Sequence, residues 1–182
     1  MQVEKTFING LLIIEPDVFE DSRGYFFETF NKNKYEQVGI DADFVQDNVS
    51  KSNRGTIRGL HYQVGKFAQG KICSVLKGSV IDVAVDIRFG SSTFGEYFSI
   101  ELSDKNKIQL WIPVGFAHGF AVKSDDTIFT YKCTSEYHKE SERSIIYSDS
   151  DLNINWQIDN PIVSDKDLGG IPFKNIGKDF SI

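Results

Sequence analysis

Two segments of the chain place a histidine in a pattern that suits proton transfer near neutral pH. One is IRGLHYQ, in which His61 stands close to Arg58 and Gln63, and the other is WIPVGFAHGF, in which His118 ends a P-x-G-x-x-H spacing. Histidine is the side chain whose ordinary pKa best matches a base that removes a proton next to a carbonyl. Taken alone, a histidine in a strand is also typical of a hydrogen-bonded structural residue.

A lysine and a tyrosine supply the other groups that such a reaction needs. Lys71, in QGKICSV, offers a positive charge to stabilise an enolate, and Tyr131, in YKC, offers a hydroxyl to return the proton on the opposite face of the carbon. Taken alone, Lys71 is typical of a solvated surface residue and Tyr131 of an amphipathic strand residue. The two residues become candidates only in combination with the histidines.

The two histidine segments together resemble the two halves of a cupin, the double-stranded β-helix jelly roll. Many cupins hold a metal ion with two histidines two residues apart, a glutamate and a later histidine. Here Gln63 replaces the second histidine of the pair, and the third histidine of the chain, His138, lies in the polar stretch SEYHKESE. A transition-metal site needs several imidazole or thiolate ligands in fixed geometry, so the sequence predicts no metal site.

The composition limits the classes of protein to which the chain can belong. The 182 residues are 40% hydrophobic and 25% charged, which is typical of one globular domain over residues 1–182. A net charge of −6 argues against a protein that grips nucleic acid, although it allows a local basic site. MQVEKTFING lacks a signal-peptide pattern and no run suits a membrane span, so we expect a cytoplasmic protein. Cys73 and Cys133 fit no C-x-x-C spacing and are expected to be reduced core residues.

Alternation with a period of two dominates the chain. In SVIDVAVDI, residues 79–87, four aliphatic side chains alternate with Asp82 and Asp86, which predicts a strand buried on one side. The same alternation recurs at 97–102 and 129–133, and shorter extended runs lie at 10–16, 25–30, 43–49, 56–63, 71–76, 108–113 and 118–123. Many short strands separated by turn signals favour an all-β sandwich or small barrel over a doubly wound α/β fold.

Two local features refine this prediction. Strict alternation puts Arg58 and His61 on opposite faces of a strand, so a shared site requires a bulge, which Gly59 permits.

The segment NKNKYEQVG predicts one short helix over residues 31–39, begun by Asn31 and ended by a glycine, with a hydrophobic contact from Phe30.

A series of motifs identifies a family. DSRGYFFETFN, FVQDN, RGLHYQ, QGK, DVAVDIR, SSTFGEY, WIPVGFAHGF and YKCTSEYHKESER follow one another at the family's spacing, and the chain resembles the dTDP-4-dehydrorhamnose 3,5-epimerase family from about residue 20 to residue 156. The resemblance implies a cupin-type jelly roll with a few short helices that forms a homodimer and uses no cofactor. It also implies that the enzyme converts dTDP-4-dehydro-6-deoxy-D-glucose to dTDP-4-dehydro-L-rhamnose, by inverting C3 and C5 of the sugar, on the route to dTDP-L-rhamnose.

The resemblance also implies roles for individual residues. His61 would be the proton-abstracting base and Asp167 in SDKD would orient it, while Lys71 would stabilise the enolate and Tyr131 would be the acid. Tyr137 would stack on thymine. The other residues that would surround the nucleotide and its diphosphate are Arg23, Glu28, Gln46, Asn48, Arg58, His118, Glu142 and Lys166.

The chain also departs from the family pattern, and the alternatives remain open at this point. The family usually has a tryptophan followed by Asn-Asp-Pro or Asp-Asp-Pro where this chain has Tyr147-Ser148-Asp149-Ser150, and Gln157 follows Trp156 where a proline is common. These changes bear on loop geometry more than on the reaction. The alternatives are a 3-epimerase of a related deoxysugar pathway, a non-catalytic sugar-nucleotide-binding jelly roll and a metal-dependent cupin oxygenase or isomerase.

Overall fold

The computed structural model describes residues 1–182 and consists mainly of antiparallel strands. The strands are β1 (Gln2–Lys5), β2 (Leu12–Glu15), β3 (Val18–Asp21), β4 (Gly24–Phe27), β5 (Gln46–Ser52), β6 (Ile57–Gln63), β7 (Lys71–Lys77), β8 (Ser79–Asp86), β9 (Tyr97–Ser103), β10 (Gln109–Ile112), β11 (Phe116–Val122), β12 (Thr127–Cys133) and β13 (Glu142–Ser144). The helices are α1 (Lys32–Gln37) and α2 (Asp165–Leu168), with 3-10 turns at Gly65–Phe67, Lys139–Ser141 and Phe173–Asn175. No helix has the length and apolarity that a membrane crossing requires.

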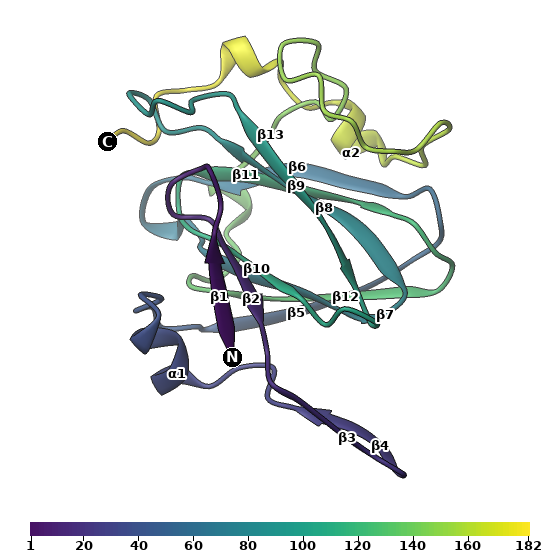
Figure 1. The fold of residues 1–182 in the computed structure, drawn as a ribbon. Coiled ribbons are helices and arrows are strands. Elements are labelled where there is room, and N and C mark those ends of the chain that lie inside the picture. The colour runs from purple at the N-terminus through teal and green to yellow at the C-terminus, as the bar shows by residue number, and fades with distance from the viewer.

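Two sheets face each other and enclose the interior (Figure 1). The larger sheet has the strand order β1-β2-β10-β7-β12-β5, and the smaller has the order β13-β6-β11-β8-β9. Strands far apart in the sequence, such as β7 and β12 or β8 and β11, are antiparallel neighbours, which is the connectivity of a jelly roll. The predicted all-β jelly roll with few short helices is confirmed.

The main core lies between the two sheets and is built from inward-facing apolar side chains of both. Phe120 of the smaller sheet stacks on Phe129 of the larger one, with ring centroids 4.1 Å apart. Both residues are almost fully buried. Cys73, also in this core, is a free thiol. This packing fixes the distance between the sheets and therefore the positions of polar groups that the same strands carry.

The prediction that the strand over residues 79–87 is buried on one side is wrong. Asp82 and Asp86 on β8 are fully buried, as are the aliphatic residues that alternate with them. Val83 and its neighbours pack under the C-terminal segment, while Asp82 faces the interior between the sheets, where it meets His118. The strand has two buried faces because the chain after β13 adds a further layer on the smaller sheet.

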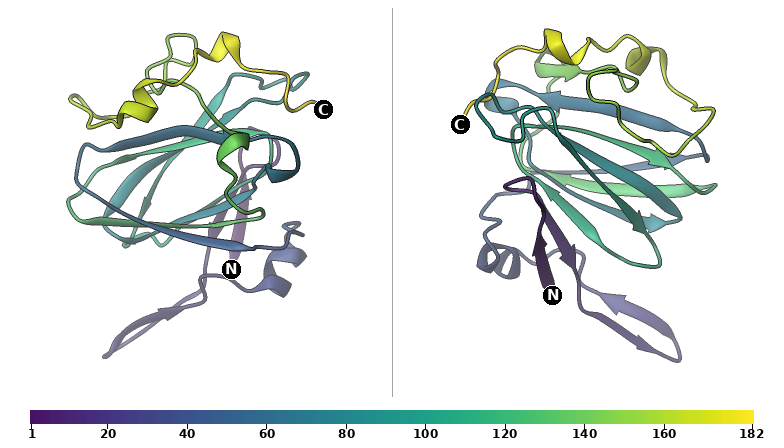
Figure 2. Two further views of the ribbon diagram at one scale, coloured as in Figure 1. Left: turned by 180° about the vertical axis from the view of Figure 1, so that it is seen from behind. Right: turned by 45° about the horizontal axis from the view of Figure 1, so that its top comes forward.

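The C-terminal layer crosses the outer face of the smaller sheet (Figure 2). Its anchor is Trp156, which packs into the apolar cluster and donates its indole N–H to the carbonyl of Tyr147 at 2.8 Å. Asp149 is buried and accepts hydrogen bonds from three backbone amides, including that of Phe173 at 2.8 Å. Gln157 has a φ of +56°, which proline cannot adopt. The departures from the family pattern therefore coincide with a specific turn that Asp149 holds together.

The predicted helix over residues 31–39 is confirmed as α1. Asn31 accepts a hydrogen bond from the backbone amide of Lys34, and Phe30 packs on Tyr35 with ring centroids 5.0 Å apart. Tyr35 is buried and its hydroxyl donates to the side-chain oxygen of Gln109 on β10. The helix is thus attached to the outer face of the larger sheet.

The hairpin of β3 and β4 projects away from the sandwich (Figure 1). Phe19, Tyr25 and Phe26 on this hairpin each expose more than half of their surface. Arg23, at the hairpin turn, forms an ion pair with Asp21. An isolated two-stranded hairpin is at best marginally stable in water, so these aromatic side chains are unusual for a monomer surface.

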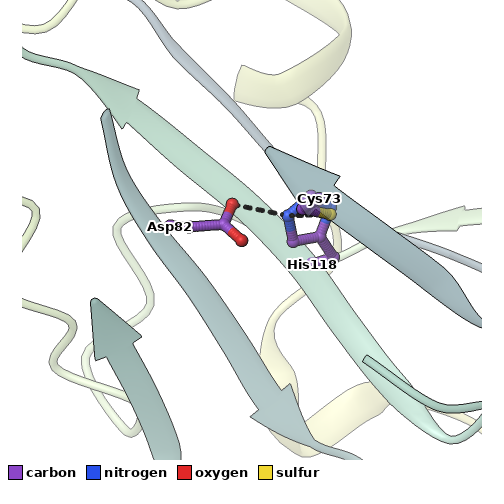
Figure 3. Close-up of side chains that lie close together, drawn as sticks. All are labelled: Cys73, Asp82 and His118. Atoms are coloured by element: carbon purple, nitrogen blue, oxygen red, sulfur yellow. Dashed lines mark hydrogen bonds and ion pairs between the residues drawn. The ribbon is translucent and has the colours of Figure 1, made fainter. Parts of the chain in front are cut away.

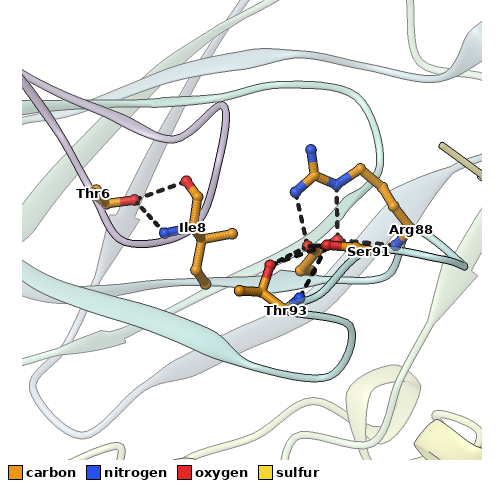
Figure 4. Close-up of polar contacts among 6 residues, drawn as sticks. Thr6, Ile8, Arg88, Ser91 and Thr93 are labelled. Atoms are coloured by element: carbon orange, nitrogen blue, oxygen red, sulfur yellow. Dashed lines mark hydrogen bonds and ion pairs between the residues drawn. The ribbon is translucent and has the colours of Figure 1, made fainter.

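The end of β8 is held by a buried polar network (Figure 4). The Asp86 carboxylate accepts hydrogen bonds from the Arg88 guanidinium at 2.7 and 2.8 Å and from the hydroxyls of Ser91 and Thr93. Burial raises the pKa of Asp86, but these donors outweigh burial and lower the pKa to about 2. The network fixes the turn that leads from β8 toward β9.

Candidate active site

A bulge between β6 and β11 brings the predicted site residues to one face. His118 lies opposite His61 across the two strands, but Phe120 lies opposite Arg58, so β6 has one residue more than β11 in this stretch. Gly59 occupies the bulge with a φ of +119°, and a Cβ at this position would lie 2.5 Å from the Cα of Gly119. Only glycine fits this close crossing, and the predicted bulge is confirmed.

Three of the predicted catalytic residues line one cavity of about 70 Å³. His61 comes from β6, Lys71 from the start of β7 and Tyr131 from β12. The Lys71 ammonium lies 5.7 Å from the centroid of the Tyr131 ring. Lys71 is largely buried and no carboxylate in the chain lies within ion-pair distance of it. Its charge is therefore available to an anion that enters the cavity.

Burial also controls the protonation state of Tyr131. It raises the pKa of the phenol to about 12, with the two nearby cysteines adding to the increase. The hydroxyl stays protonated at neutral pH and can act as a proton donor. A buried hydroxyl beside an ammonium is well suited to protonating a basic carbanion.

Asp167 lies behind His61 and orients it. The carboxylate contacts His61 Nε2 at 2.5 Å and also accepts a hydrogen bond from the Gly59 amide at 3.4 Å. Burial raises the pKa of Asp167, but the hydrogen bond and charge of His61 outweigh it and leave the pKa below its usual value. Ser164 begins helix α2 by accepting from the Asp167 amide, which fixes the carboxylate in place. This arrangement leaves His61 Nδ1 free to accept a proton.

The rim of the cavity holds a second polar network. Glu142 accepts hydrogen bonds from the Tyr137 hydroxyl at 3.0 Å and from the Lys166 ammonium at 2.6 Å. Burial raises the pKa of Glu142, but Lys166 and Tyr137 outweigh it and lower the pKa. Gln46 accepts from the Tyr137 amide at 2.8 Å and donates to Asn48. The ring of Tyr137 stays half exposed at the cavity mouth.

The structure separates two predicted residues from the rest. Arg23 lies at the turn of the β3–β4 hairpin with most of its side chain in solvent. Glu28 lies between this hairpin and α1, where it accepts hydrogen bonds from Lys34 and Asn31. Neither residue lines the cavity of its own chain. Arg58, by contrast, lies near enough to Tyr131 to affect its pKa, and donates a hydrogen bond to Ser52.

His118 lies deeper than the sequence predicted. Its ring is buried between the sheets, with Nε2 2.7 Å from Asp82 Oδ1 and 3.7 Å from Cys73 Sγ (Figure 3). Burial lowers the pKa of His118 more than the Asp82 carboxylate raises it. Sequence reasoning missed Asp82, although Val80 and Ala84 on the same face of the strand were a signal that this face is buried.

Gln63 explains why the histidine pair of metal-binding cupins does not form here. Its amide donates to the carbonyls of Phe67 and Glu136 at 2.8 and 3.0 Å, and its oxygen accepts from the His138 amide at 2.6 Å. The side chain therefore fastens the loop after β12 to β6. An amide held in this way does not fit the role of the second imidazole ligand in those cupins.

The fold defines the class first: the protein is a cupin-type jelly roll. A family model described as dTDP-4-dehydrorhamnose 3,5-epimerase matches residues 5–175, and the chain belongs to this family, as its motifs predicted.

The relatives agree with this assignment. The dTDP-4-dehydrorhamnose 3,5-epimerase of Shigella flexneri is 53% identical over 174 residues, which are 95% of this chain and 96% of the relative. The structure of a Legionella pneumophila 3,5-epimerase in complex with dTDP-4-keto-L-rhamnose has a TM-score of 0.93 and 49% identity, covering 97% of this chain and 94% of that one. A 3'-monoepimerase from Streptomyces bikiniensis in complex with dTDP-quinovose has a TM-score of 0.87 and 31% identity, covering 93% and 86%.

Proposed function

We propose that the protein converts dTDP-4-dehydro-6-deoxy-D-glucose to dTDP-4-dehydro-L-rhamnose by inverting C3 and C5, on the route to dTDP-L-rhamnose, without metal or cofactor. The observation that carries this proposal is the meeting of His61, Lys71 and Tyr131 in one cavity. They supply a base, an unpaired cation and a protonated acid. An epimerisation next to a ketone is redox-neutral and needs no other group.

The reaction begins with proton abstraction by His61. Nδ1 takes the C–H proton next to the ketone, and the electron pair of the broken bond moves onto the ketone oxygen to form an enolate. Asp167 stabilises the resulting imidazolium through its contact with Nε2. The Lys71 ammonium has no carboxylate partner and stabilises the enolate oxygen.

Tyr131 completes each inversion. Its hydroxyl, kept protonated by a pKa of about 12, gives a proton to the carbon from the face opposite His61. Re-forming the C–H bond collapses the enolate to the ketone. His61 then loses its proton to solvent and Tyr131 regains one. The same groups act at the second carbon after the sugar turns in the site.

The rim residues are proposed to bind the nucleotide. The half-exposed Tyr137 ring offers a face for thymine, and Lys166 and Arg58 offer positive charge to the diphosphate. Gln46 and Glu142 hold Tyr137 in position. Asn48 and the buried His118 complete the predicted set, His118 from beneath the cavity. A local cluster of cations reconciles an anionic ligand with a net charge of −6.

A homodimer accounts for the two separated residues. Arg23 and Glu28 do not reach the cavity of their own chain, yet the hairpin that carries Arg23 exposes three aromatic side chains. The family resemblance implies a homodimer, so we take a second copy of the chain as the occupant of this surface. We propose that the hairpin packs on the partner and delivers Arg23 to the partner's nucleotide site.

Mixed dimers test this arrangement. Arg23→Ala and His61→Ala chains are each expected to be nearly inactive alone. After unfolding and refolding together, half of the dimers would be mixed, and each would hold one intact site, so activity should recover to about a quarter of wild type. No recovery, with light scattering showing a monomer, would contradict the shared site.

Two further expectations fit this proposal. We propose that residues 1–182 form a single jelly-roll domain. We also propose a cytoplasmic location, which the two free thiols, Cys73 and Cys133, support because the cytosol keeps thiols reduced.

Deuterium incorporation tests the reaction itself. The purified enzyme is incubated with dTDP-4-dehydro-6-deoxy-D-glucose in D₂O, and carbon-bound deuterium is followed by NMR. We expect label at C3 and C5 and a rhamno product. Label at C3 alone would favour the 3-epimerase, an outcome that the fold also accommodates. Absence of enzyme-dependent label would contradict the proposed substrate and favour a binding module.

His61→Ala should lower turnover by about 10²- to 10⁴-fold. The control His138→Ala, outside the cavity, should retain the turnover of the wild type.

A further inference from the structure

A buried group of three metal-ligating side chains lies beneath the catalytic cavity. Cys73 on β7, Asp82 on β8 and His118 on β11 come from facing sheets and point toward one another (Figure 3). One sulfur, one carboxylate oxygen and one imidazole nitrogen all lie within 4.8 Å of one another. These are three ligand types that bind Zn²⁺. The group does not use Gln63 and is therefore different from the cupin histidine pair.

The second carboxylate oxygen of Asp82 is an independent sign that the group is incomplete. Asp82 is fully buried and its Oδ1 is bonded to His118, but Oδ2 has no hydrogen-bond partner. A buried polar atom without a partner destabilises the fold, and the more so when it is charged. A cation at this place would satisfy the unpaired oxygen.

We propose that Cys73, Asp82 and His118 form a binding site for a thiophilic divalent cation such as Zn²⁺, and that an ion bound there inhibits the enzyme. The distances suit such an ion. Zn–N and Zn–O bonds of about 2.0–2.2 Å and a Zn–S bond of about 2.3 Å fit three ligand atoms this close together after a small opening of the His118–Asp82 contact.

Charge balance favours occupancy. Binding forms an S–Zn bond as the S–H bond of Cys73 breaks, and the thiol proton passes to solvent. His118 binds through Nε2 while its proton moves to Nδ1. One thiolate and one carboxylate then neutralise the two charges of the ion, where the metal-free group buries an incompletely paired Asp82. Burial and the Asp82 carboxylate raise the pKa of the Cys73 thiol, so the S–Zn bond itself must drive the loss of the proton. Lys71 opposes the cation, but it also lowers the pKa of the thiol.

The site communicates with the cavity through the strand register. Tyr131 is the cross-strand neighbour of Cys73, and His61 is that of His118. An ion bound beneath them would fix His118 and bring positive charge next to Lys71. Turnover would therefore fall. The binding is independent of the proposed reaction, and only the inhibition depends on it.

Cobalt spectroscopy tests the binding directly. Chelator-treated protein is titrated with Co²⁺, which gives a thiolate-to-metal charge-transfer band when a cysteine is a ligand, and Zn²⁺ is then added to displace it. We expect one ion per chain and loss of the band in Cys73→Val. Since changes outside the ligand shell already cost about 10- to 100-fold in affinity, loss of a ligand should weaken Zn²⁺ binding at least roughly 100-fold. Cys133→Val, which alters the other buried thiol, should keep the band.

A second pair of measurements guards against a folding artefact and separates the two claims. A wild-type crystal soaked in Zn²⁺ should show an anomalous peak about 2.3 Å from Cys73 Sγ. In the deuterium assay, Zn²⁺ should inhibit wild type reversibly and spare Cys73→Val. A wild-type protein without a thiolate band, or a band kept by Cys73→Val and lost by Cys133→Val, would overturn the site. Binding without inhibition would overturn only the inhibitory role.

Discussion

Replacing Asp167 by asparagine removes the negative charge beside the proposed base and keeps the size of the side chain. The Ser164 hydrogen bond that begins α2 goes to the backbone of residue 167 and survives the change. The Gly59 amide still finds a carbonyl oxygen on asparagine, and the asparagine NH2 then faces His61 Nε2 in place of a carboxylate oxygen. The substitution therefore removes the charge and also favours the imidazole tautomer with its proton on Nδ1, which cannot accept the substrate proton.

The structure sets the expected size of the effect. The carboxylate contacts His61 Nε2 at 2.5 Å, and the imidazolium formed during abstraction would face it. A hydrogen bond to a charged group contributes about 1.5–3 kcal/mol, so loss of the charge alone should lower turnover about 10- to 150-fold, and the wrong tautomer should lower it further. Solvent reaches the His61 side chain, which is 28% exposed, and screens the pair, so its full Coulomb energy does not appear in the rate.

The assay is kcat for inversion together with the rate of deuterium entry, measured across pH. Both rates should fall together at every pH, because abstraction precedes inversion. Asp165→Asn, an exposed position in the same helix turn, is the matched control and should keep near-normal rates. Turnover of Asp167→Asn within about threefold of wild type would refute the role of the pair.

Three further predictions follow from the same geometry. Tyr131→Phe should still exchange substrate protons for deuterium while inversion falls by about 10²-fold or more, because abstraction no longer leads to correct reprotonation; equal loss of exchange and inversion in NMR assays would contradict this division. The pKa of Asp86 is about 2 in the folded chain against 3.8 ordinarily, so the ionised carboxylate contributes about 2 kcal/mol of stability above pH 4, which is lost as the pH falls toward 2. Urea unfolding should show this pH dependence, and Asp86→Asn should flatten it. Gly59→Ala should lower the free energy of unfolding by roughly 3 kcal/mol or more, because its Cβ would lie 2.5 Å from the Cα of Gly119. The control Gly65→Ala has a positive φ too but open space around the added Cβ, so it should lower that free energy by only about 1 kcal/mol in the same urea unfolding experiment.

Local rules predicted the elements that local interactions decide. The helix at residues 31–39 follows from the Asn31 cap and the Phe30–Tyr35 contact, both of which lie within one turn of sequence. The bulge at Gly59 follows from the spacing of Arg58 and His61, because residues three apart on a regular strand point to opposite faces. In each case the cause and the effect are a few residues apart, which is the range over which sequence patterns carry structural information.

β8 is buried on both faces because the C-terminal segment covers the smaller sheet, and the residue pattern of the strand itself does not predict this cover. Asp82 and Asp86 predicted a solvent-exposed face because charged residues are rarely buried unless they are paired. Their partners, His118 and Arg88, come from another strand and from the turn after β8. Likewise the family motifs assembled most of the site but did not indicate that Arg23 lies on a projecting hairpin. Both features, the burial of the β8 carboxylates and the position of the hairpin, depend on contacts between segments far apart in the sequence or on the arrangement of whole elements.

The division between strands and rim has a chemical consequence. His61, Lys71 and Tyr131 stand on three strands of a sandwich packed by stacked rings, so the proposed base, cation and acid have fixed relative positions. The proposed nucleotide ligands Tyr137 and Lys166 come from a loop and a short helix, where the chain can change without repacking the core. One carbon or two will then be inverted according to how the rim holds the sugar over an unchanged acid–base set. Exchange of rim segments between a 3-epimerase and this chain should therefore alter the positions of deuterium label while exchange at the first carbon continues.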